Sequence, residues 1–504
     1  MRKIAFFDTS LRDGEQTPGI NLNGKEKLEL ARALAAAGID VIEAGFPAAS
    51  KGDFEAVMQI AKEIKGSSVA GLCRAVEADI HTAWEALRFA EKPRIHVFIA
   101  TSPLHMEFKL RKQPDQVLAS AVKAVKLAKS YCQQVEFSCE DATRSEIPFL
   151  IEICKAVAEA GATVINLPDT VGYTVPQDYA KMIAAVRAEL PPEVQISAHC
   201  HDDLGMGVAN TLAAIEAGAD QVETTVCGIG ERAGNAAFEE VVMALTTRAD
   251  HYQVEHNINT RRIYNLSRLV SKYTGIDIPA GKAVIGDNAF LHQSGIHQHG
   301  VMANRLTYEI MSPESIGRPS SDNMVLGKLS GSHAFATKLE EWGFHLSPED
   351  LAFAFARFKE LADVKKDVTM RDISAIIGGR LREVPNTISL ENYQIMSCNT
   401  ISTTATVCLR RGDEVLRRAA IANGPVDAAF EAITDMLEMP LNLESYGIKA
   451  VTEGRDALGE VTVRVRYHDS IYMGKGVSND IIESSILAYI NAINRLFAEE
   501  LTAE

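Results

Sequence analysis

The chain of 504 residues lacks the features that would place it in a membrane or in an oxidising compartment. It has no run of 18 apolar residues, whereas a membrane-spanning helix needs about 20. The opening segment MRKIAFFDTS leads directly into an apolar run, so no targeting peptide is expected. The 8 cysteines are scattered and include no C-x-x-C pair, which is typical of reduced thiols. We therefore expect a soluble, cytoplasmic protein.

Positive charge is also scarce. Lys and Arg number 51 against 67 Asp and Glu, which gives a net charge of -16. Nucleic acids and anionic membranes are bound by basic surfaces, so neither is an expected partner. A small anionic ligand is still allowed, because a bound metal ion or an arginine can reverse the local field. The length exceeds what one hydrophobic core usually serves, so at least two domains are expected.

From residue 3 to about 245, short apolar runs alternate with amphipathic helical patterns. One predicted helix stops at Gly38 and another follows Pro176. Eight such units over about 250 residues are typical of a TIM (β/α)8 barrel, and a doubly wound open sheet is the alternative. The predicted strands lie at residues 4–9, 39–44, 69–73, 94–100, 133–138, 162–167, 194–198 and 220–226.

The barrel makes a second prediction, that functional side chains gather where the strands end, because the strand-to-helix loops build the active face. Polar or ionisable residues do mark the ends of all the predicted strands. An open sheet would not collect so many on one rim. In chain order they are Arg12 and Asp13, Glu43, Arg74, His96 and Thr101, Ser138 and Glu140, Asp169 and Thr170, His199 and His201, and Glu231, Arg232 and Asn235.

The most informative motif is HCHDD at 199–203, directly after the seventh strand. Alternate residues of a strand point the same way, so His199 and His201 would project two imidazoles from the rim. Asp13 would reach the same rim as a third metal ligand, although an Asp before a helix is also a common N-cap. Two imidazoles with oxygen donors and open positions suit a divalent cation that also holds substrate. Histidines satisfied by carbonyl groups are the alternative.

The segment GIGERAGN at 228–235 adds a fourth donor. Its glycines allow a tight loop, and Asn235 offers a side-chain carbonyl as a neutral ligand. Glycines alone would be weak evidence, since loops are rich in them. The adjacent Glu231 and Arg232 make the segment distinctive.

We predict three parts, at 1–250 (barrel), 251–388 (mostly helical) and 389–504. The last part is internally duplicated. Two strands and a helix recur with an offset near 56, which places Thr406 opposite Thr462 and Asp413 opposite Asp469. The predicted fold is therefore an α/β TIM barrel, a helical linker region and a C-terminal duplicated ββα domain.

Segments along almost the whole chain resemble the 2-isopropylmalate synthase family, within the acetyl-CoA-dependent 2-oxoacid condensing enzymes. Homocitrate synthases as a rule carry Glu at the position of Asp13. Citramalate synthases usually lack the EAGFP and DTVGY motifs that this chain has. Beyond the barrel the resemblance continues through YEIMSPESIG at 308–317 and through GPVDAAFEAI in the C-terminal domain, which is similar to the family's leucine-sensing module. The barrel segments are DTSLRDGEQTPG, EAGFP, HVFIATSP, FSCEDATRSE, LPDTVGY, HCHDDLGMGVAN and GIGERAGN.

This resemblance implies Claisen-type condensation of acetyl-CoA with 3-methyl-2-oxobutanoate, followed by thioester hydrolysis to 2-isopropylmalate and CoA in leucine biosynthesis. A divalent metal, Mn or Mg with Zn as an alternative, would polarise the ketone of the 2-oxoacid. Arg12 would stabilise that oxygen as it becomes an alkoxide, the alternative being a surface salt bridge. The implied metal ligands are Asp13, His199, His201 and Asn235.

The resemblance also implies how the 2-oxoacid is held. Thr170, with backbone help near Asn166 and Pro168, is expected to bind its carboxylate. His96 and Ser138 resemble residues around the alkyl group. A monovalent cation such as K⁺ is compatible with the family.

Acetyl-CoA must lose a methyl proton, so a base must lie within hydrogen-bond reach. Glu140, His297 and Tyr308 are the candidates, and His297 is the first choice because its ordinary pKa is near neutral. By resemblance, the segment that holds His297 and Tyr308 covers the active site of the partner subunit in a homodimer. Two departures bear on acetyl-CoA: His299 stands where the family commonly has Asp, and GKLSGSHAF at 327–335 replaces a more basic segment.

Several functions compete with this one. Citramalate synthesis from pyruvate is the alternative within the class, and a metal-dependent lyase or aldolase would use a similar barrel. A catalytically idle sensor would use the duplicated domain alone. For that domain we expect feedback inhibition by leucine, the alternative being a dimerisation module without a ligand.

Overall fold

The computed structural model describes residues 1–319, 326–328, 330–341, 346–365, 368, 372–373, 376, 387–398, 402–450, 459–468, 470–478 and 480–503. Residue 329 of the GKLSGSHAF segment and Asp469 of the predicted repeat lie outside these residues. The chain divides into two compact units, Met1–Lys338 and Leu339–Glu504.

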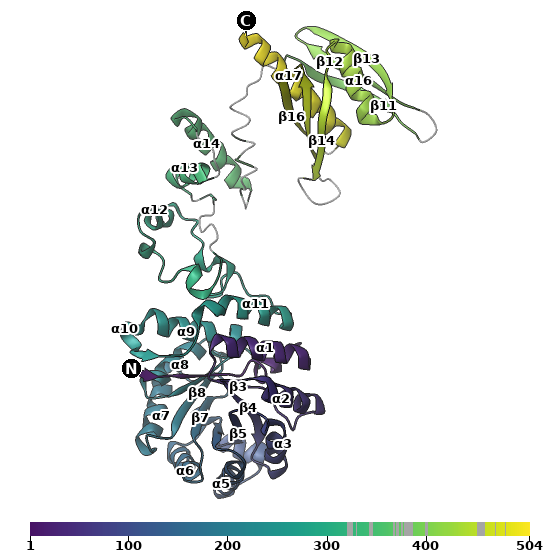
Figure 1. The fold of residues 1–504 in the computed structure, drawn as a ribbon. Helices are drawn as coiled ribbons and strands as arrows, with labels where there is room; N and C mark the ends of the chain where they lie inside the picture. The colour runs from purple at the N-terminus through teal and green to yellow at the C-terminus, as the bar shows by residue number, and fades with distance from the viewer. Residues whose placement is uncertain are drawn as a thin grey trace. The chain divides into compact units, whose positions relative to one another are not determined.

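Eight parallel strands of the first unit close into a barrel in chain order, which confirms the predicted fold and excludes the open sheet (Figure 1). The closure pairs the last strand with the first, with Ala5 beside Gln221. Each observed strand overlaps a predicted one. They are β2 (Ala5–Asp8), β3 (Val41–Glu43), β4 (Ser68–Arg74), β5 (Pro93–Ala100), β6 (Gln134–Glu140), β7 (Val164–Asp169), β8 (Gln195–Cys200) and β9 (Gln221–Thr224).

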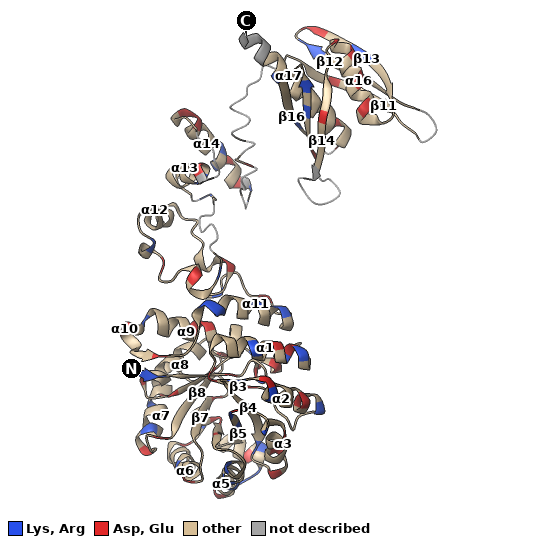
Figure 2. Ribbon diagram, in the orientation of Figure 1, with Lys and Arg blue, Asp and Glu red and all other residues tan. Residues whose placement is uncertain are grey.

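Amphipathic helices surround the barrel. In α1 (Gly24–Ala37), Leu28, Ala31 and Leu34 are buried, and the helix ends at Gly38 in the left-handed conformation, as its sequence pattern predicts. Charged residues mark the outer helices such as α1 and α2, while most strand ribbon is uncharged (Figure 2). The other main helices are α2 (Lys51–Glu63), α3 (Glu77–Leu87), α5 (Pro114–Tyr131), α6 (Ile147–Glu159), α7 (Pro176–Glu189), α8 (Gly207–Glu216) and α9 (Phe238–Thr247).

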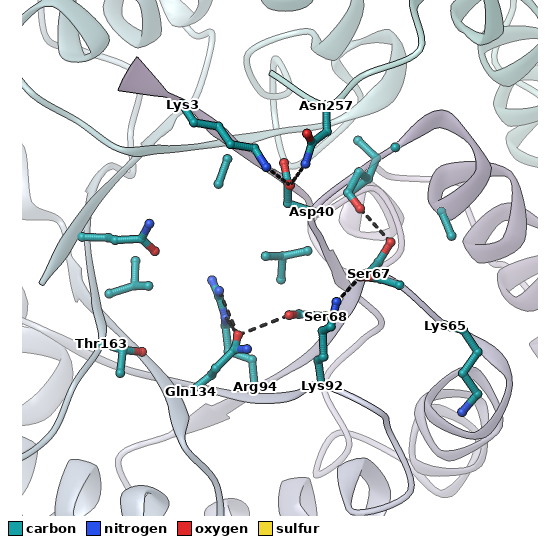
Figure 3. Close-up of a pocket in the computed structure, with 18 residues that line it drawn as sticks. Lys3, Asp40, Lys65, Ser67, Ser68, Lys92, Arg94, Gln134, Thr163 and Asn257 are labelled. Atoms are coloured by element: carbon teal, nitrogen blue, oxygen red, sulfur yellow. Dashed lines mark hydrogen bonds and ion pairs between the residues drawn. The ribbon is translucent and has the colours of Figure 1, made fainter. Parts of the chain in front are cut away.

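The end of the barrel where the strands begin is crossed by a short parallel pair, β1 (Arg2–Lys3) with β10 (Val254–Glu255). A polar cavity of about 590 Å³ lies here (Figure 3). Some of its polar side chains are hydrogen-bonded to one another: Asn257 donates to Asp40 at 2.7 Å, and Arg94 donates to Gln134 at 3.1 Å.

After the barrel the described residues contain the helices expected for 251–388. These are α11 (Ile263–Thr274), α12 (Gly295–Ala303), α13 (Ser332–Glu341) and α14 (Pro348–Val364). Within the part of the chain that the structure describes, no helix is both long and apolar enough to cross a membrane.

The C-terminal part holds two antiparallel sheets, each followed by a helix, which confirms the predicted duplication. Strand β12 begins at Thr403 and β15 at Gly459, 56 residues later. Each sheet has one strand more than the sequence pattern predicts, β11 in the first and β14 in the second. Side chains from both halves, including Ile433, Val463 and Ile490, form one core. The elements are β11 (Ser389–Met396), β12 (Thr403–Arg411), β13 (Glu414–Ala422), α16 (Pro425–Leu437), β14 (Asn442–Ala450), β15 (Gly459–Tyr467), β16 (Ser470–Ser478) and α17 (Ile481–Ala503).

Candidate active site

A cavity of about 290 Å³ opens at the carboxyl ends of the barrel strands. It brings together every barrel residue that the resemblance assigns to catalysis, substrate binding or metal binding except Asn235, whose Nδ2 donates to Asp13. The predicted residues that line it are Arg12, Asp13, His96, Ser138, Glu140, Asn166, Pro168, Thr170, His199 and His201. Thus the end-of-strand positions do converge on one rim.

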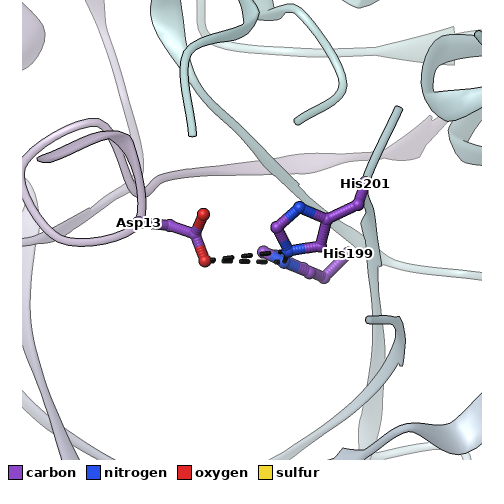
Figure 4. Close-up of side chains that lie close together, drawn as sticks. All are labelled: Asp13, His199 and His201. Carbon is purple, nitrogen blue, oxygen red and sulfur yellow. Dashed lines mark hydrogen bonds and ion pairs between the residues drawn. The ribbon is translucent and has the colours of Figure 1, made fainter. Parts of the chain in front are cut away.

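Asp13, His199 and His201 form a buried group that could hold a metal ion (Figure 4). The two Nε2 atoms lie 3.2 Å apart, and Asp13 Oδ2 lies 4.0 Å from that of His199 and 3.8 Å from that of His201. Asp13 precedes a short 3-10 helix, but its side chain makes no capping hydrogen bond. Its carboxylate faces the imidazoles, which argues against the N-cap interpretation.

Both imidazoles are held by their other nitrogen. Nδ1 of His199 lies 2.9 Å from Oε2 of Glu223, and Nδ1 of His201 lies 3.1 Å from the carbonyl oxygen of Gly234. A carbonyl can only accept, so Nδ1 of His201 carries the proton and Nε2 keeps a lone pair. Such outer contacts fix the tautomer and the ring orientation of metal-binding histidines.

For Asp13 and His201 the electrostatics favour the protonation states that a metal needs. Burial lowers the pKa of His199, but the Glu223 and Asp13 carboxylates outweigh it and raise the net pKa above its ordinary value. Burial lowers the pKa of His201 to about 4. Burial raises the pKa of Asp13, but the Arg12 guanidinium and the nearby imidazoles outweigh it, and the net pKa lies below the ordinary value. At neutral pH, Asp13 is therefore ionised and His201 is neutral, as ligation requires.

Asn235 has an amide oxygen without a hydrogen-bond partner, as expected of a fourth metal ligand. Its Nδ2 donates to Oδ1 of Asp13 at 2.8 Å and to the carbonyl of Ile229 at 3.1 Å. Its Oδ1 is buried and has no hydrogen-bond partner. A backbone bridge between His201 and Asn235 brings the loop to the strand end. A buried carbonyl oxygen without a partner is costly, and a metal ion would satisfy it.

Arg12 links the metal group to the barrel wall. Its Nη1 donates to Asp13 at 2.7 Å and its Nε to Glu43 at 2.7 Å, and its side chain is only 11% exposed. The surface salt-bridge interpretation is therefore wrong. Glu43 also accepts from Thr9 at 2.6 Å. Burial opposes ionisation of Glu43, but Arg12 and His96 lower its pKa to about 2.

The wall expected to face the 2-oxoacid is a hydrogen-bonded row. His96 contacts Glu43 through Nδ1 at 2.7 Å and Ser138 through Nε2 at 2.6 Å. Asn166 donates to Ser138 at 2.8 Å, while its own Oδ1 is buried without a partner. Thr170 Oγ1 accepts from the amide of Asp141 at 2.9 Å. Three apolar side chains share the cavity without having been predicted: Phe46, Leu72 and Phe98.

The three candidate bases are not brought together. Glu140 lines the cavity, where its Oε1 lies 2.5 Å from Nζ of Lys109. His297 on α12 stacks on Tyr308, with ring centroids 4.1 Å apart. Neither ring is among the residues that line the barrel cavity. Their role in a partner subunit's site thus stays a prediction.

Sequence reasoning missed Glu223 and Lys109, and besides Asn235 four residues of the predicted rim do not line the cavity: Glu43, Arg74, Thr101 and Asp169. Glu223 stands within the predicted eighth strand, 220–226, and a carboxylate in the middle of a barrel strand is a signal that could have been read. Lys109 carries no comparable signal, since it lies in a short π-helical turn, Met106–Leu110, in a segment rich in charge. Arg74 is 59% exposed and pairs with Asp79 instead of lining the cavity.

Comparison with known proteins places the fold and site in a class. The family model described as HMGL-like matches residues 3–270. The homocitrate synthase post-HMGL domain-like model matches 284–366, and the LeuA allosteric (dimerisation) domain matches 367–497. The chain is thus an HMGL-like barrel enzyme that carries a LeuA allosteric (dimerisation) domain. The boundaries predicted at 250 and 388 stay a prediction.

Relatives identify the family within this class. The chain is 53% identical to the 2-isopropylmalate synthase of Ruminiclostridium cellulolyticum over 99% of this chain and 98% of the relative. It is 52% identical to those of Dictyoglomus turgidum and Pyrococcus furiosus, over 98% of this chain and 99% of each relative. A Bacillus subtilis HMG-CoA lyase structure matches with 21% identity and a TM-score of 0.48, over 55% of this chain and 96% of that one. The chain belongs to the 2-isopropylmalate synthase family.

Proposed function

We propose that the chain condenses acetyl-CoA with 3-methyl-2-oxobutanoate and hydrolyses the thioester, giving 2-isopropylmalate and CoA for leucine biosynthesis. The relatives named above carry this activity in their names. The structural observation that supports it is the convergence of Asp13, His199, His201 and the unpartnered Oδ1 of Asn235 at one rim. The lyase and idle-sensor alternatives have no comparable support, since they do not explain full-length similarity to synthases.

A divalent metal, Mn or Mg with Zn as an alternative, fits this donor set and would supply Lewis-acid polarisation of the 2-oxoacid ketone. Asp13, His199, His201 and Asn235 would hold it. Arg12, fixed between Asp13 and Glu43, would donate to the ketone oxygen as negative charge develops there. A monovalent cation such as K⁺ is a further part of this proposal.

The hydrogen-bonded row orients the 2-oxoacid. Thr170, with the backbone near Asn166 and Pro168, would receive its carboxylate. Ser138 and His96 would lie beside its alkyl chain. Because Ser138 is already held by His96 and Asn166, it cannot rotate freely toward solvent.

Deprotonation of the acetyl methyl group needs a base among Glu140, His297 and Tyr308, and we propose His297 of the partner subunit. The resulting carbon nucleophile forms the new bond to the ketone carbon, and the ketone oxygen ends as a hydroxyl. Water then cleaves the thioester and releases CoA. Glu140, at the cavity wall, would position the thioester or the water.

A 2-oxoacid panel separates our substrate choice from citramalate synthesis. Purified enzyme with Mn²⁺ and acetyl-CoA is given 3-methyl-2-oxobutanoate, 2-oxobutanoate or pyruvate, and thiol release is followed. We expect the branched substrate to give the highest kcat/KM, because Phe46, Leu72 and Phe98 offer an apolar wall to its methyl groups. Equal or better turnover of pyruvate would show that the choice is wrong.

For the C-terminal domain we propose leucine as the effector and a homodimer as the assembly. The match to the LeuA allosteric (dimerisation) domain supports both a dimer and a small-molecule effector. We also propose a cytoplasmic location, where thiols stay reduced, in keeping with 8 free cysteines.

A further inference from the structure

Glu223 is a buried carboxylate that the proposed reaction does not use. It lies on β9 with 1% of its surface exposed. Its carboxylate lies 2.9 Å from Nδ1 of His199 and accepts from Oγ of Ser197 at 3.4 Å. Burying a carboxylate in a barrel core is costly unless it is firmly paired. The pairing with His199 therefore calls for an explanation beyond packing.

The register between neighbouring barrel strands places Glu223 beside His199. Strands β8 and β9 are parallel neighbours, and His199 is in register with Glu223. Two residues earlier on each strand, Ser197 is in register with Gln221. Side chains two residues apart point the same way, so His199 and Glu223 form one inward layer above Ser197 and Gln221.

The layer beneath holds Glu223 in place. Gln221 donates to Ser197 at 2.9 Å and to Glu136 at 2.7 Å, and Arg94 donates to Gln221 at 2.7 Å. Arg94 then reaches Gln134, and the two are drawn with their hydrogen bond in Figure 3, at the opposite end of the barrel. A buried hydrogen-bonded column thus runs from His199 to the far cavity and leaves the Glu223 side chain few other positions.

The two imidazoles of the metal group differ in what orients them. His201 has a backbone acceptor, the carbonyl oxygen of Gly234, which no side-chain substitution can remove. His199 has only the Glu223 carboxylate at its Nδ1. Without an acceptor there, the imidazole proton is free to sit on Nε2, the nitrogen that faces His201 and Asp13, and that tautomer cannot bind a metal.

We propose that Glu223 is a positioning residue: it holds the proton of His199 on Nδ1 and the ring in the orientation that presents Nε2 to the metal. This inference rests on the proposed metal site. It assigns no direct contact between Glu223 and substrate or metal. Loss of such an outer partner typically weakens metal binding about 10- to 100-fold.

Three variants separate hydrogen bonding from charge. E223Q keeps an acceptor oxygen at the same distance but loses the charge. E223M keeps the approximate volume and loses both the charge and the acceptor, and E223D keeps the charge on a shorter arm. We expect Mn²⁺ affinity to be highest for wild type, lower for E223Q, and lowest for E223D and E223M, which should be similar. E223M should bind Mn²⁺ about 10- to 100-fold more weakly than wild type. A purely electrostatic role predicts instead that E223D binds well and that E223Q and E223M bind equally poorly.

The measurement is Mn²⁺ titration of the metal-free, full-length enzyme by calorimetry, with the visible spectrum of the Co²⁺-loaded protein as a second readout of ligand geometry. E239Q is the matched control, because Glu239 is also fully buried and its carboxylate accepts from the backbone amide of Cys227 instead of from an imidazole. Its Mn²⁺ affinity should equal that of wild type. If E223M fails to fold, the comparison of E223Q with E223D decides alone.

The outcomes are distinguishable. Failure of the wild-type enzyme to bind Mn²⁺ would contradict the proposed metal site itself. Normal binding by wild type and by all three variants would overturn the positioning role while leaving that site intact. The electrostatic order of affinities, or an unchanged Co²⁺ spectrum in E223M, would also overturn it.

Discussion

At the scale of single residues, the site is built from charges that the barrel core brings into contact. Arg12 lies between two carboxylates, and both Asp13 and Glu43 are almost fully buried. Ion pairs interact more strongly where water is excluded. The arrangement also fixes the guanidinium in direction, since its Nε and Nη1 have different partners.

The two-way contact of Arg12 leads to a prediction for R12K. A lysine keeps one positive charge but cannot donate to both carboxylates in the planar geometry of arginine. We expect kcat to fall about 100- to 1000-fold, as for loss of an oxyanion donor, with a smaller change in Mn²⁺ affinity. Steady-state thiol release measures kcat. R74K is the control, because Arg74 pairs with Asp79 outside the cavity, and a kcat of R12K equal to that of R74K would contradict the assigned role.

A second residue-scale prediction concerns pH. Burial raises the pKa of Glu239 from its ordinary value of 4.5 to about 7. The folded state therefore favours the protonated form, and this stabilisation is complete below pH 4.5 and is lost as pH rises through 7. At about 1.4 kcal/mol per pKa unit, wild type should lose up to about 3 kcal/mol relative to E239Q over this range.

Urea unfolding of wild type and E239Q at several pH values between 4.5 and 8 tests this. Glu136, whose pKa burial also raises to about 7, titrates in both proteins. Burial raises the pKa of Asp8 to about 7 as well, and the Glu239 charge adds to that shift, so the difference reports Glu239 together with its coupling to Asp8. Parallel curves for the two proteins would contradict the prediction.

At the scale of elements, local signals set where helices begin and end. Asn23 caps α1 by accepting from the amides of Lys25 and Glu26, and Glu26 accepts from the amide of Asn23 in return. Helix α3 starts instead at Val76, which makes no capping bond and is 50% exposed. The two helices thus offer a matched pair, one capped and one uncapped.

We expect N23A to lower the free energy of unfolding by about 1 kcal/mol and V76S to raise it by up to about 1 kcal/mol, because an N-cap oxygen satisfies an otherwise unpaired amide. Urea midpoints measure both. Should the two substitutions move the midpoint in the same direction, the capping explanation fails.

Elements with a clear periodic pattern were predictable, and those without one were not. The barrel strands are continuous apolar runs because helices cover them. Strands β11 and β14 lie at the edges of their sheets, each paired with one neighbour only, and much of each is exposed. Strands β13 and β16 are edge strands too, but each follows a predicted strand after a turn, at residues 411–413 and 468–470. Strands β11 and β14 carry no such turn signal, so their sequences read as loops.

At the scale of the whole molecule, the two parts have separate cores. The barrel cluster contains residues up to Ile316, and the C-terminal cluster begins at Ile388. Among the residues that the structure describes, the two clusters share no side chain. A regulatory part built in this way can bind its effector without forming part of the catalytic pocket.

Deletion of residues 390–504 should therefore leave Mn²⁺ binding unchanged within a few-fold and abolish leucine binding. Calorimetry on the full-length and shortened chains measures both ligands without depending on activity, which a lost dimer would also reduce. Leucine binding that survives the deletion would show that the sensor assignment is wrong.

The sequence alone determined the barrel, the duplicated domain and most of the metal group. Side chains two residues apart on a strand point the same way, and all strands of a parallel barrel end on the same rim. These two rules suffice to place Asp13, His199 and His201 on one rim. The tertiary structure alone decided how those groups are tuned. The pairing of Glu223 with His199, the burial of Arg12 between two carboxylates and the unpartnered oxygen of Asn235 depend on distances between strands and loops far apart in the chain, and no local pattern encodes such distances.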